Sequence, residues 1–475
     1  MKKITTIKIY LIYLIITGAL SCKIPVMNVK KLDTTVPNSY TGLVDTVNNA
    51  DIQWRLYYKD PNLTALIDSA LQNNQELNIL LQEIASSKNE VTARKGEYLP
   101  FVNLGAAAGP EKSGRYTFDG ISEEDIKANP GREPKYLGDY MVGAYASWEL
   151  DIWKKLRNAK KSALMKYLST VEGRNFMVTN LVAEIAASYY ELMGLDNLLE
   201  IIHQNILIQD NALRIIKLEK EAAKVSQLAV NRFDAQLLNT KNLQFDIQQK
   251  IVEVENRINF LVGRFPQHIN RQSNSFNEIK TDIVHTGIPS SLLANRPDIR
   301  QAEFDLSSAK LDVDVARANF YPSVRLTASI GLNAFNPAYI IKPASILYNF
   351  TGDLIAPLIN KNAINAIYKN ANLKQTASVY NYEKTILAAY IDVLNQLAKT
   401  ENYLSSYETK LREVEILSQS ILISNDLFVS ARADYIEVLL TQREALESKI
   451  DLIEIKLKQL EAKVNIYRAL GGGWK

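Results

Sequence analysis

The chain has 475 residues, of which 47% are hydrophobic and 23% are charged, so it can bury a large core, and a disordered or collagen-like chain is excluded. Its formal net charge of +3 falls to zero without Lys2, Lys3 and Lys8, so the basic surplus of a nucleic-acid-binding protein is absent. One cysteine and three histidines are too few for a disulfide framework or a Cys/His zinc site. We therefore expect no nucleic acid partner, no metal site and no thiol redox chemistry.

The N-terminus has the pattern of an export signal. Two lysines precede an apolar, uncharged run over 9–20, which is typical of a secretory signal peptide and too short to span a bilayer. The run ends at Ala19-Leu20-Ser21-Cys22, which resembles the cleavage box of a bacterial lipoprotein with Cys22 as the lipidated first residue. Such boxes usually carry leucine where Ala19 stands, and an ordinary signal peptide is the alternative. No later apolar run is long enough for a transmembrane helix, so a mature chain that enters a membrane does so as strands.

Long stretches of the chain contain nothing that would end a helix. Proline is absent between Pro134 and Pro266 and after Pro357, and glycine is absent between Gly352 and Gly471. The sequence predicts helices over about 152–222 and 361–432, each about 100 Å long at 1.5 Å per residue. Apolar residues in these stretches and in the segments that follow them recur at heptad spacing, which predicts helices packed along helices; they include Ile202, Ile206, Leu213, Ile216, Ile247, Val254, Ile258, Leu446, Ile453, Leu460 and Val464.

The chain is internally duplicated, and this sets its architecture. The block from Asn74 aligns with the block from Arg296 at an offset of 222 residues, which also places Pro100 on Pro322. Further on, Leu228 aligns with Ile436 at an offset of 208 residues. The difference places a longer surface loop in the first half, in the glycine-, proline- and charge-rich stretch 110–135.

Each half also contains two strand-like segments. Apolar and polar residues alternate with period two in all four, which is typical of outer membrane barrel strands, although soluble hairpins packed on helices are the alternative; the apolar positions are Val102, Leu104, Ala106, Ala108, Tyr140, Val142, Ala144, Ala146, Trp148, Leu150, Val324, Leu326, Ala328, Ile330, Leu332, Ile346, Tyr348, Phe350 and Leu354. Four strands cannot close around a pore, and an open sheet edge is excluded from lipid. We therefore expect an oligomer, with three chains and twelve strands if it encloses a pore.

The order of these parts, together with LLANRPDIRQAE at 292–303, ANFYPSVRL at 318–326 and WELDIW at 148–153, resembles the outer membrane factors of the TolC/OprM type, in their lipoprotein efflux branch. The resemblance implies an α+β membrane protein: a homotrimer with a twelve-stranded outer membrane β-barrel, four strands per chain, continued by a periplasmic α-helical barrel. It also implies a passive efflux channel, anchored by lipid on Cys22 in the bacterial outer membrane and joined to an inner-membrane pump by a periplasmic adaptor protein.

No catalytic site and no cofactor other than this lipid are expected. The sequence contains no phosphate-binding loop, no nucleophile elbow and no zinc-protease motif. Two other classes are the alternatives: a lipid-anchored coiled-coil envelope protein without a pore, and a periplasmic enzyme.

The layout implied by the resemblance divides the chain into consecutive parts. They are a signal peptide at 1–21, an N-terminal equatorial segment at 22–61, helical barrel at 62–99, a first transmembrane hairpin at 100–151, a long helix and return helix at 152–262, an equatorial segment at 263–296, helical barrel at 297–321, a second transmembrane hairpin at 322–358, a second long helix and return helix at 359–470, and a tail at 471–475.

The resemblance also implies the functional positions. The helix turns at Val225-Ser226 and Ala433-Asp434 are expected to contact the adaptor, with plain solvated turns as the alternative. Glu437 matches the first acidic residue that narrows the family's tunnel, whereas Leu440 stands at the second acidic position. We therefore expect a periplasmic gate at Glu437 that is less charged than usual, with an exposed helical glutamate as the alternative.

Overall fold

The computed structural model describes residues 24–27, 30–40, 47–111, 137–280, 285–357 and 359–475. The chain divides into two compact units, the first made of 1–31, 85–168 and 304–380 and the second of 32–84, 169–303 and 381–475. Cys22 lies outside the described residues. No helix in the described part of the chain combines the length and the apolarity needed to cross a membrane.

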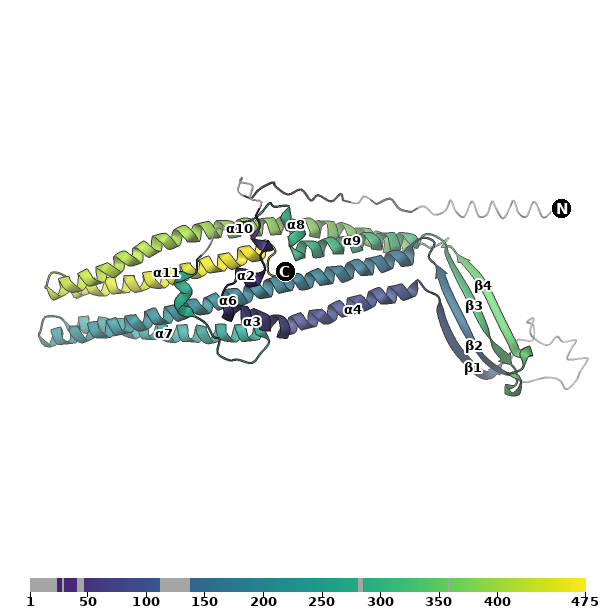
Figure 1. Ribbon diagram of the computed structural model, residues 1–475, viewed down its shortest axis with the longest axis horizontal. Coiled ribbons are helices and arrows are strands. Elements are labelled where there is room, and N and C mark those ends of the chain that lie inside the picture. The colour runs from purple at the N-terminus through teal and green to yellow at the C-terminus, as the bar shows by residue number, and fades with distance from the viewer. Residues whose placement is uncertain (1–23, 28–29, 41–46, 112–136, 281–284, 358) are drawn as a thin grey trace, which may run out of the picture. The chain divides into compact units, whose positions relative to one another are not determined.

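The first unit contains an antiparallel sheet whose four strands lie side by side in chain order (Figure 1). The strands are β1 (Phe101–Glu111), β2 (Leu137–Leu150), β3 (Ser323–Ala334) and β4 (Ile346–Ile355). Within the described residues β1 pairs only with β2, and β4 pairs only with β3. The outer edges of β1 and β4 therefore present backbone donors and acceptors that one copy of this sheet does not pair.

The strand register confirms the predicted alternation. Val102 pairs with Ala146, Ala146 with Ala328, and Ala328 with Phe350, so one apolar row crosses all four strands. The next residue on each strand belongs to the opposite face, because successive side chains of a strand point to opposite sides. That face carries the row Asn103, Tyr145, Ser329 and Asn349. The apolar side chains are largely exposed in the single chain, with Leu104 at 88% and Tyr348 at 84%.

Two of the motifs behind the family resemblance meet where strand gives way to helix. Asp151 follows β2 and accepts hydrogen bonds from the backbone amides of Leu156 (2.8 Å) and Arg157 (3.0 Å), which satisfies free donors at the start of the next helix. The Trp153 ring stacks on Tyr321 at 4.6 Å between centroids, and its indole N–H donates to the carbonyl of Pro322 at 2.7 Å. These residues fix the junction between β2 and the helix.

The long helices fall in the two predicted stretches, which lack proline and contain little or no glycine. They are α6 (Lys155–Glu221) with its return helix α7 (Gln227–Val262), and α10 (Asn362–Val429) with its return helix α11 (Tyr435–Ala469). In the second unit α7 lies along α6 and α11 along α10 (Figure 1). The remaining elements are η1 (Asn49–Asp51), α2 (Trp54–Tyr57), α3 (Pro61–Asn73), α4 (Gln75–Glu97), η2 (Ser273–Glu278), α8 (Ser291–Asn295), α9 (Pro297–Ala318), η3 (Pro337–Tyr339) and η4 (Pro343–Ser345).

The heptad stripes form the core of the second unit, as expected from their spacing. Ile202, Ile258, Ile453 and Leu460 are buried in one cluster that also holds the aromatic residues of α2. The rings of Tyr57 and Tyr467 stack at 4.1 Å, and the Tyr467 hydroxyl donates to the carbonyl of Ile52 at 2.6 Å. The segment before α3 is thereby tied to the end of α11.

The duplication extends to individual hydrogen bonds. In the first half the Asn74 amide donates to the carbonyl of Leu261 at 2.9 Å; in the second half the Arg296 guanidinium donates to the carbonyl of Ala469 at 2.8 Å. The two donors, Asn74 and Arg296, are related by the alignment offset of 222 residues, and the two acceptors, Leu261 and Ala469, by the offset of 208 residues. Asn74 also separates α3 from α4, because its side chain accepts from the amide of Leu77 at 2.9 Å and caps the start of α4.

The second version of this contact is charged. Arg296 also donates to both carboxylate oxygens of Asp298, at 3.0 and 2.7 Å, and lies 3.5 Å from Asp392. Burial alone would lower the pKa of Arg296, but hydrogen bonds and attraction from Asp298 and Asp392 outweigh it and raise that pKa. The motif Arg296-Pro297-Asp298 therefore connects the start of α9 to the end of α11, through Ala469, and to α10, through Asp392.

Candidate functional site

The two predicted helix turns are present and have the same backbone. Helix α6 ends at Glu221 and α7 begins at Gln227, while α10 ends at Val429 and α11 begins at Tyr435. In each turn an alanine adopts the left-handed conformation, Ala223 with φ of 53° and Ala431 with φ of 57°. The amide that follows each alanine donates to a carbonyl five residues earlier, at 2.9 and 2.8 Å. This hydrogen bond satisfies a carbonyl at the end of the helix. In most proteins the residue that adopts the left-handed conformation at such a helix end is glycine.

The four residues predicted to contact a partner lie in these turns. Ser226 and Asp434 are the residues directly before α7 and α11, and neither side chain caps its helix by a hydrogen bond. Both side chains are exposed, while those of Val225 and Ala433 are partly buried. The hydroxyl of Ser226 and the carboxylate of Asp434 are therefore exposed at the turns and do not cap the helices that follow them.

A small apolar cluster lies directly behind the turns. It contains Leu213 and Ile216 from α6, Phe233 and its neighbours from α7, and Val438 from α11. The cluster joins α11 to the other helix pair close to both turns. Heptad spacing predicts the α6 contribution, whereas the meeting of α11 with α6 and α7 follows only from the structure.

The predicted gate residue, Glu437, lies in the first turn of α11. Its side chain is exposed in the single chain, next to buried Val438, and its amide donates to the carbonyl of Asp434 at 3.1 Å. Leu440 follows one helical turn later and is 40% exposed. The role of Glu437 as a periplasmic gate stays a prediction.

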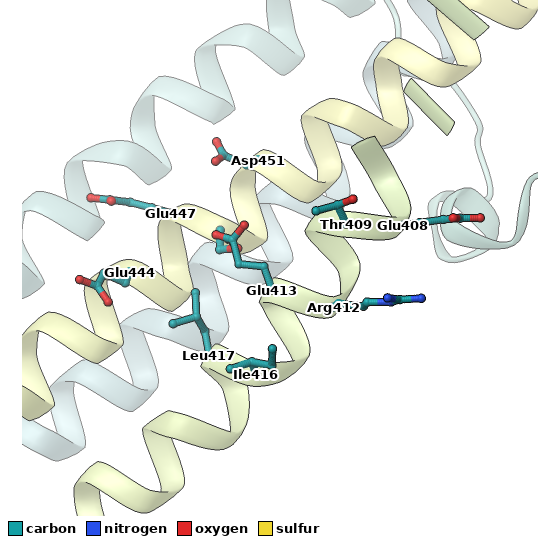
Figure 2. A pocket seen from close by; sticks show the side chains of 10 residues that line it. Glu408, Thr409, Arg412, Glu413, Ile416, Leu417, Glu444, Glu447 and Asp451 are labelled. Carbon is teal, nitrogen blue, oxygen red and sulfur yellow. The ribbon is translucent and has the colours of Figure 1, made fainter. Parts of the chain in front are cut away.

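An acidic wall, which the sequence analysis missed, lies further along the same two helices. Figure 2 shows Glu444, Glu447 and Asp451 along α11, and Glu413 extending from α10 toward that helix. They line an open cavity of about 660 Å³. The adjacent Lys410 lies 3.0 Å from Glu413 and 3.2 Å from Asp451, and Ser448 donates to Glu413 at 3.1 Å.

These contacts set the charge of the wall. The hydrogen bond from Lys410, followed by that from Ser448, lowers the pKa of Glu413. The hydrogen bond to Glu413 is the main reason that the pKa of Lys410 is raised. Both groups therefore remain charged through the neutral range. In the described segments no group of three or more His, Cys, Asp or Glu side chains could hold a metal ion.

A second feature that the sequence analysis missed is the attachment of the segment after α7. Arg271 lies 2.6 Å from Asp196 on α6 and 2.6 Å from Glu255 on α7, and its side chain is almost fully buried. Burial favours a lower pKa for Arg271, but its hydrogen bonds to the two carboxylates raise it. Phe276 is buried completely in the core of the same unit. The segment is thereby held against both helices.

Comparisons with known proteins agree with this architecture. The family model described as "Outer membrane efflux protein" matches residues 66–264 and 288–472. The chain is 27% identical over 419 residues to the solvent efflux pump outer membrane protein SrpC of Pseudomonas putida, covering 88% of this chain and 87% of that protein. It is 24% identical to the probable outer membrane lipoprotein SilC of Salmonella typhimurium, with 92% and 91% covered. The open-state MtrE outer membrane channel of Neisseria gonorrhoeae superposes with a TM-score of 0.82 at 21% identity, covering 95% and 98%.

These likenesses confirm the predicted fold class, in which each chain of an outer membrane channel supplies four strands and a set of long helices. The predicted outer membrane location and the role in efflux are confirmed as well. The comparisons favour an efflux channel over the alternative, a coiled-coil lipoprotein without a pore. The family is one of efflux channels, and the expectation that the chain has no enzymatic activity stays a prediction. The chain belongs to the outer membrane efflux protein family.

Proposed function

We propose that three copies of this chain form the outer membrane channel of a tripartite efflux system, which passively conducts drugs or other small solutes. An inner-membrane pump and a periplasmic adaptor would deliver these solutes, and the pump would select them. The observation that carries the proposal is the four-stranded sheet, with one apolar face and two edges that the described chain leaves unpaired. In lipid such edges must pair, and two further copies supply the strands of a closed barrel.

The assembly is tested by native mass spectrometry of the membrane-extracted protein in detergent, followed by conductance in planar bilayers. A trimer that forms pores is the expected result. A monomer or dimer that stays soluble without detergent would contradict the proposal. The same spectrum tests lipidation, because a diacylglycerol and an acyl chain on Cys22 add their mass to the mature chain, and a Cys22→Ser variant should lose it.

We further propose that the division of the chain given above describes its working parts. The attachment of the segment after α7 through Arg271 supports an equatorial role for 263–296, since two ion pairs hold that segment against α6 and α7. The tie between Tyr467 and Ile52 supports the same role for the end of 22–61. Residues 263–296 and 32–61 belong to the second unit.

The helix turns, through Val225, Ser226, Ala433 and Asp434, would contact the adaptor. Their shared backbone supports this, because two equivalent turns per chain would give a trimer six similar contact points. We expect Asp434→Lys to lower efflux-dependent drug resistance without lowering the amount of channel in the membrane. Asp246→Lys, which reverses an exposed charge in the middle of α7, is the matched control and should leave resistance unchanged. Equal resistance in the Asp434 variant and the wild type would remove the turns from the interface.

Glu437 would form the periplasmic gate. Three such carboxylates near one axis attract cations and repel one another. We expect the wild-type channel to prefer cations in a planar bilayer and Glu437→Gln to lose most of this preference. Glu454→Gln, an exposed glutamate further along α11, serves as the control and should retain it. If both variants kept the wild-type selectivity, Glu437 would be an ordinary surface residue.

A further inference from the structure

A second cavity lies between the two helix pairs, next to the turns. It has a volume of about 320 Å³ and is bounded by residues of α6, α7, α10 and α11. Its wall is mainly apolar and includes Ile215, Phe233, Phe428 and Val438. The volume lies at the lower end of the range of about 300–1,000 Å³ for small-molecule sites. It is about twice that of an engineered apolar cavity of roughly 150 Å³ that binds benzene.

One polar side chain in this wall has an unused hydrogen-bonding atom. Gln442 lines the cavity and is only 2% exposed, and its Oε1 has no hydrogen-bond partner among the described residues. Leaving a buried amide oxygen unpaired is unfavourable, so native structures rarely keep one without a reason. The last torsion of a glutamine side chain is broad, so Oε1 can turn at little cost toward a donor held in the cavity that Gln442 lines.

We propose that this cavity binds an aromatic or branched apolar molecule that carries a single hydrogen-bond donor, such as a phenol or a naphthol. The apolar wall would hold the body of the molecule, and Gln442 Oε1 would accept its hydroxyl proton. This wall offers no charged side chain among its residues, so a charged ligand would lose its hydration without compensation. The size of the cavity fits one or two fused rings.

Binding would also act on the helices. A molecule in this cavity contacts α6 and α7 on one side and α10 and α11 on the other, so it favours the arrangement in which α11 packs against the α6–α7 pair. That effect needs neither an adaptor nor a gate at Glu437. Binding of the molecule therefore tests this inference separately from the proposed function.

The test uses the full-length trimer in lipid nanodiscs and two matched probes, 6-bromo-2-naphthol and 2-bromonaphthalene, which differ in the hydroxyl group. We expect the naphthol to bind the wild type about tenfold more tightly, since one hydrogen bond to an otherwise unpaired acceptor is worth about that factor. In Gln442→Leu the two probes should bind with affinities within about twofold of each other. Ala212→Leu, which fills the cavity from α6, should abolish binding of both and so measures partition into the lipid.

Crystals of the trimer soaked with either probe locate it through the anomalous signal of bromine. A bromine peak inside the cavity, with a preference for the naphthol that disappears in Gln442→Leu, is the expected result. Equal preference in the wild type and Gln442→Leu would overturn the role of Gln442. Binding that persists in Ala212→Leu, or a bromine peak only elsewhere, would overturn the site.

Discussion

Replacing Arg296 by methionine should destabilise the second helical half far more than an equivalent change in the first half. Arg296 is 9% exposed, and its loss removes the donor to Asp298 Oδ2 and to the carbonyl of Ala469 and leaves Asp298 Oδ1 with the backbone amide of Ile299, at 3.0 Å. Breaking a buried ion pair from one side costs about 3–5 kcal/mol, because the remaining charge stays buried. Asp392 retains Arg468, at 3.8 Å, and the side-chain amide of Gln396, at 3.2 Å.

The first half supplies the matched control. Asn74→Ala removes the donor to Leu261 and the cap of Leu77, both neutral contacts. Their loss should cost about 1–2 kcal/mol. The two substituted positions are equivalent by the internal duplication. The difference between their losses in free energy of unfolding therefore measures the effect of the buried charge.

The assay is guanidinium unfolding of the trimer in detergent, followed by the circular dichroism of the helices. We expect the midpoint to fall in the order wild type, Asn74→Ala, Arg296→Met. Arg296→Met combined with Asp298→Leu should recover part of the loss, since it no longer leaves the Asp298 carboxylate unpaired. Equal midpoints for Asn74→Ala and Arg296→Met, or a double variant whose loss is the sum of the single losses, would refute the reasoning.

Two further predictions concern the turns and the acidic wall. Ala431→Gly should stabilise the protein by about 0.5–1 kcal/mol, because a left-handed alanine is strained and glycine is not; thermal melting measures it, and Ala433→Gly, outside that conformation, should give no gain. The lowered pKa of Glu413 means that its attraction to Lys410 stabilises the fold above the ordinary pKa of a glutamate and is lost as the pH falls through the lowered value. Melting curves from pH 7 to pH 3 should therefore show a smaller acid-induced loss in Glu413→Gln than in the wild type, and identical losses would contradict this assignment.

Patterns in the sequence were enough to locate the elements of this protein. The absence of proline and the scarcity of glycine mark the stretches that hold α6 and α10, since those residue types most often stop a helix. Period-two alternation assigned the faces of all four strands, because the strand geometry permits only two. The duplication placed both turns and, through the family resemblance, the residues in them.

Other features depend on which segments meet in space. Alanine carries no signal for a left-handed turn, so the strain at Ala223 and Ala431 becomes visible only in the backbone. Arg296 is recognisable as part of a motif that also contains its partner Asp298, but its other two partners, Asp392 and Ala469, lie 96 and 173 residues away along the chain.

The cavity at Gln442 has the same origin. A glutamine on a helix stripe is neither buried nor exposed until its neighbours are known, and here they come from four helices. Local sequence determined where this protein forms helices and strands, because backbone preferences and side-chain periodicity act over a few residues. Only the tertiary structure decided where charges are buried and where space remains, because those depend on the packing of distant segments.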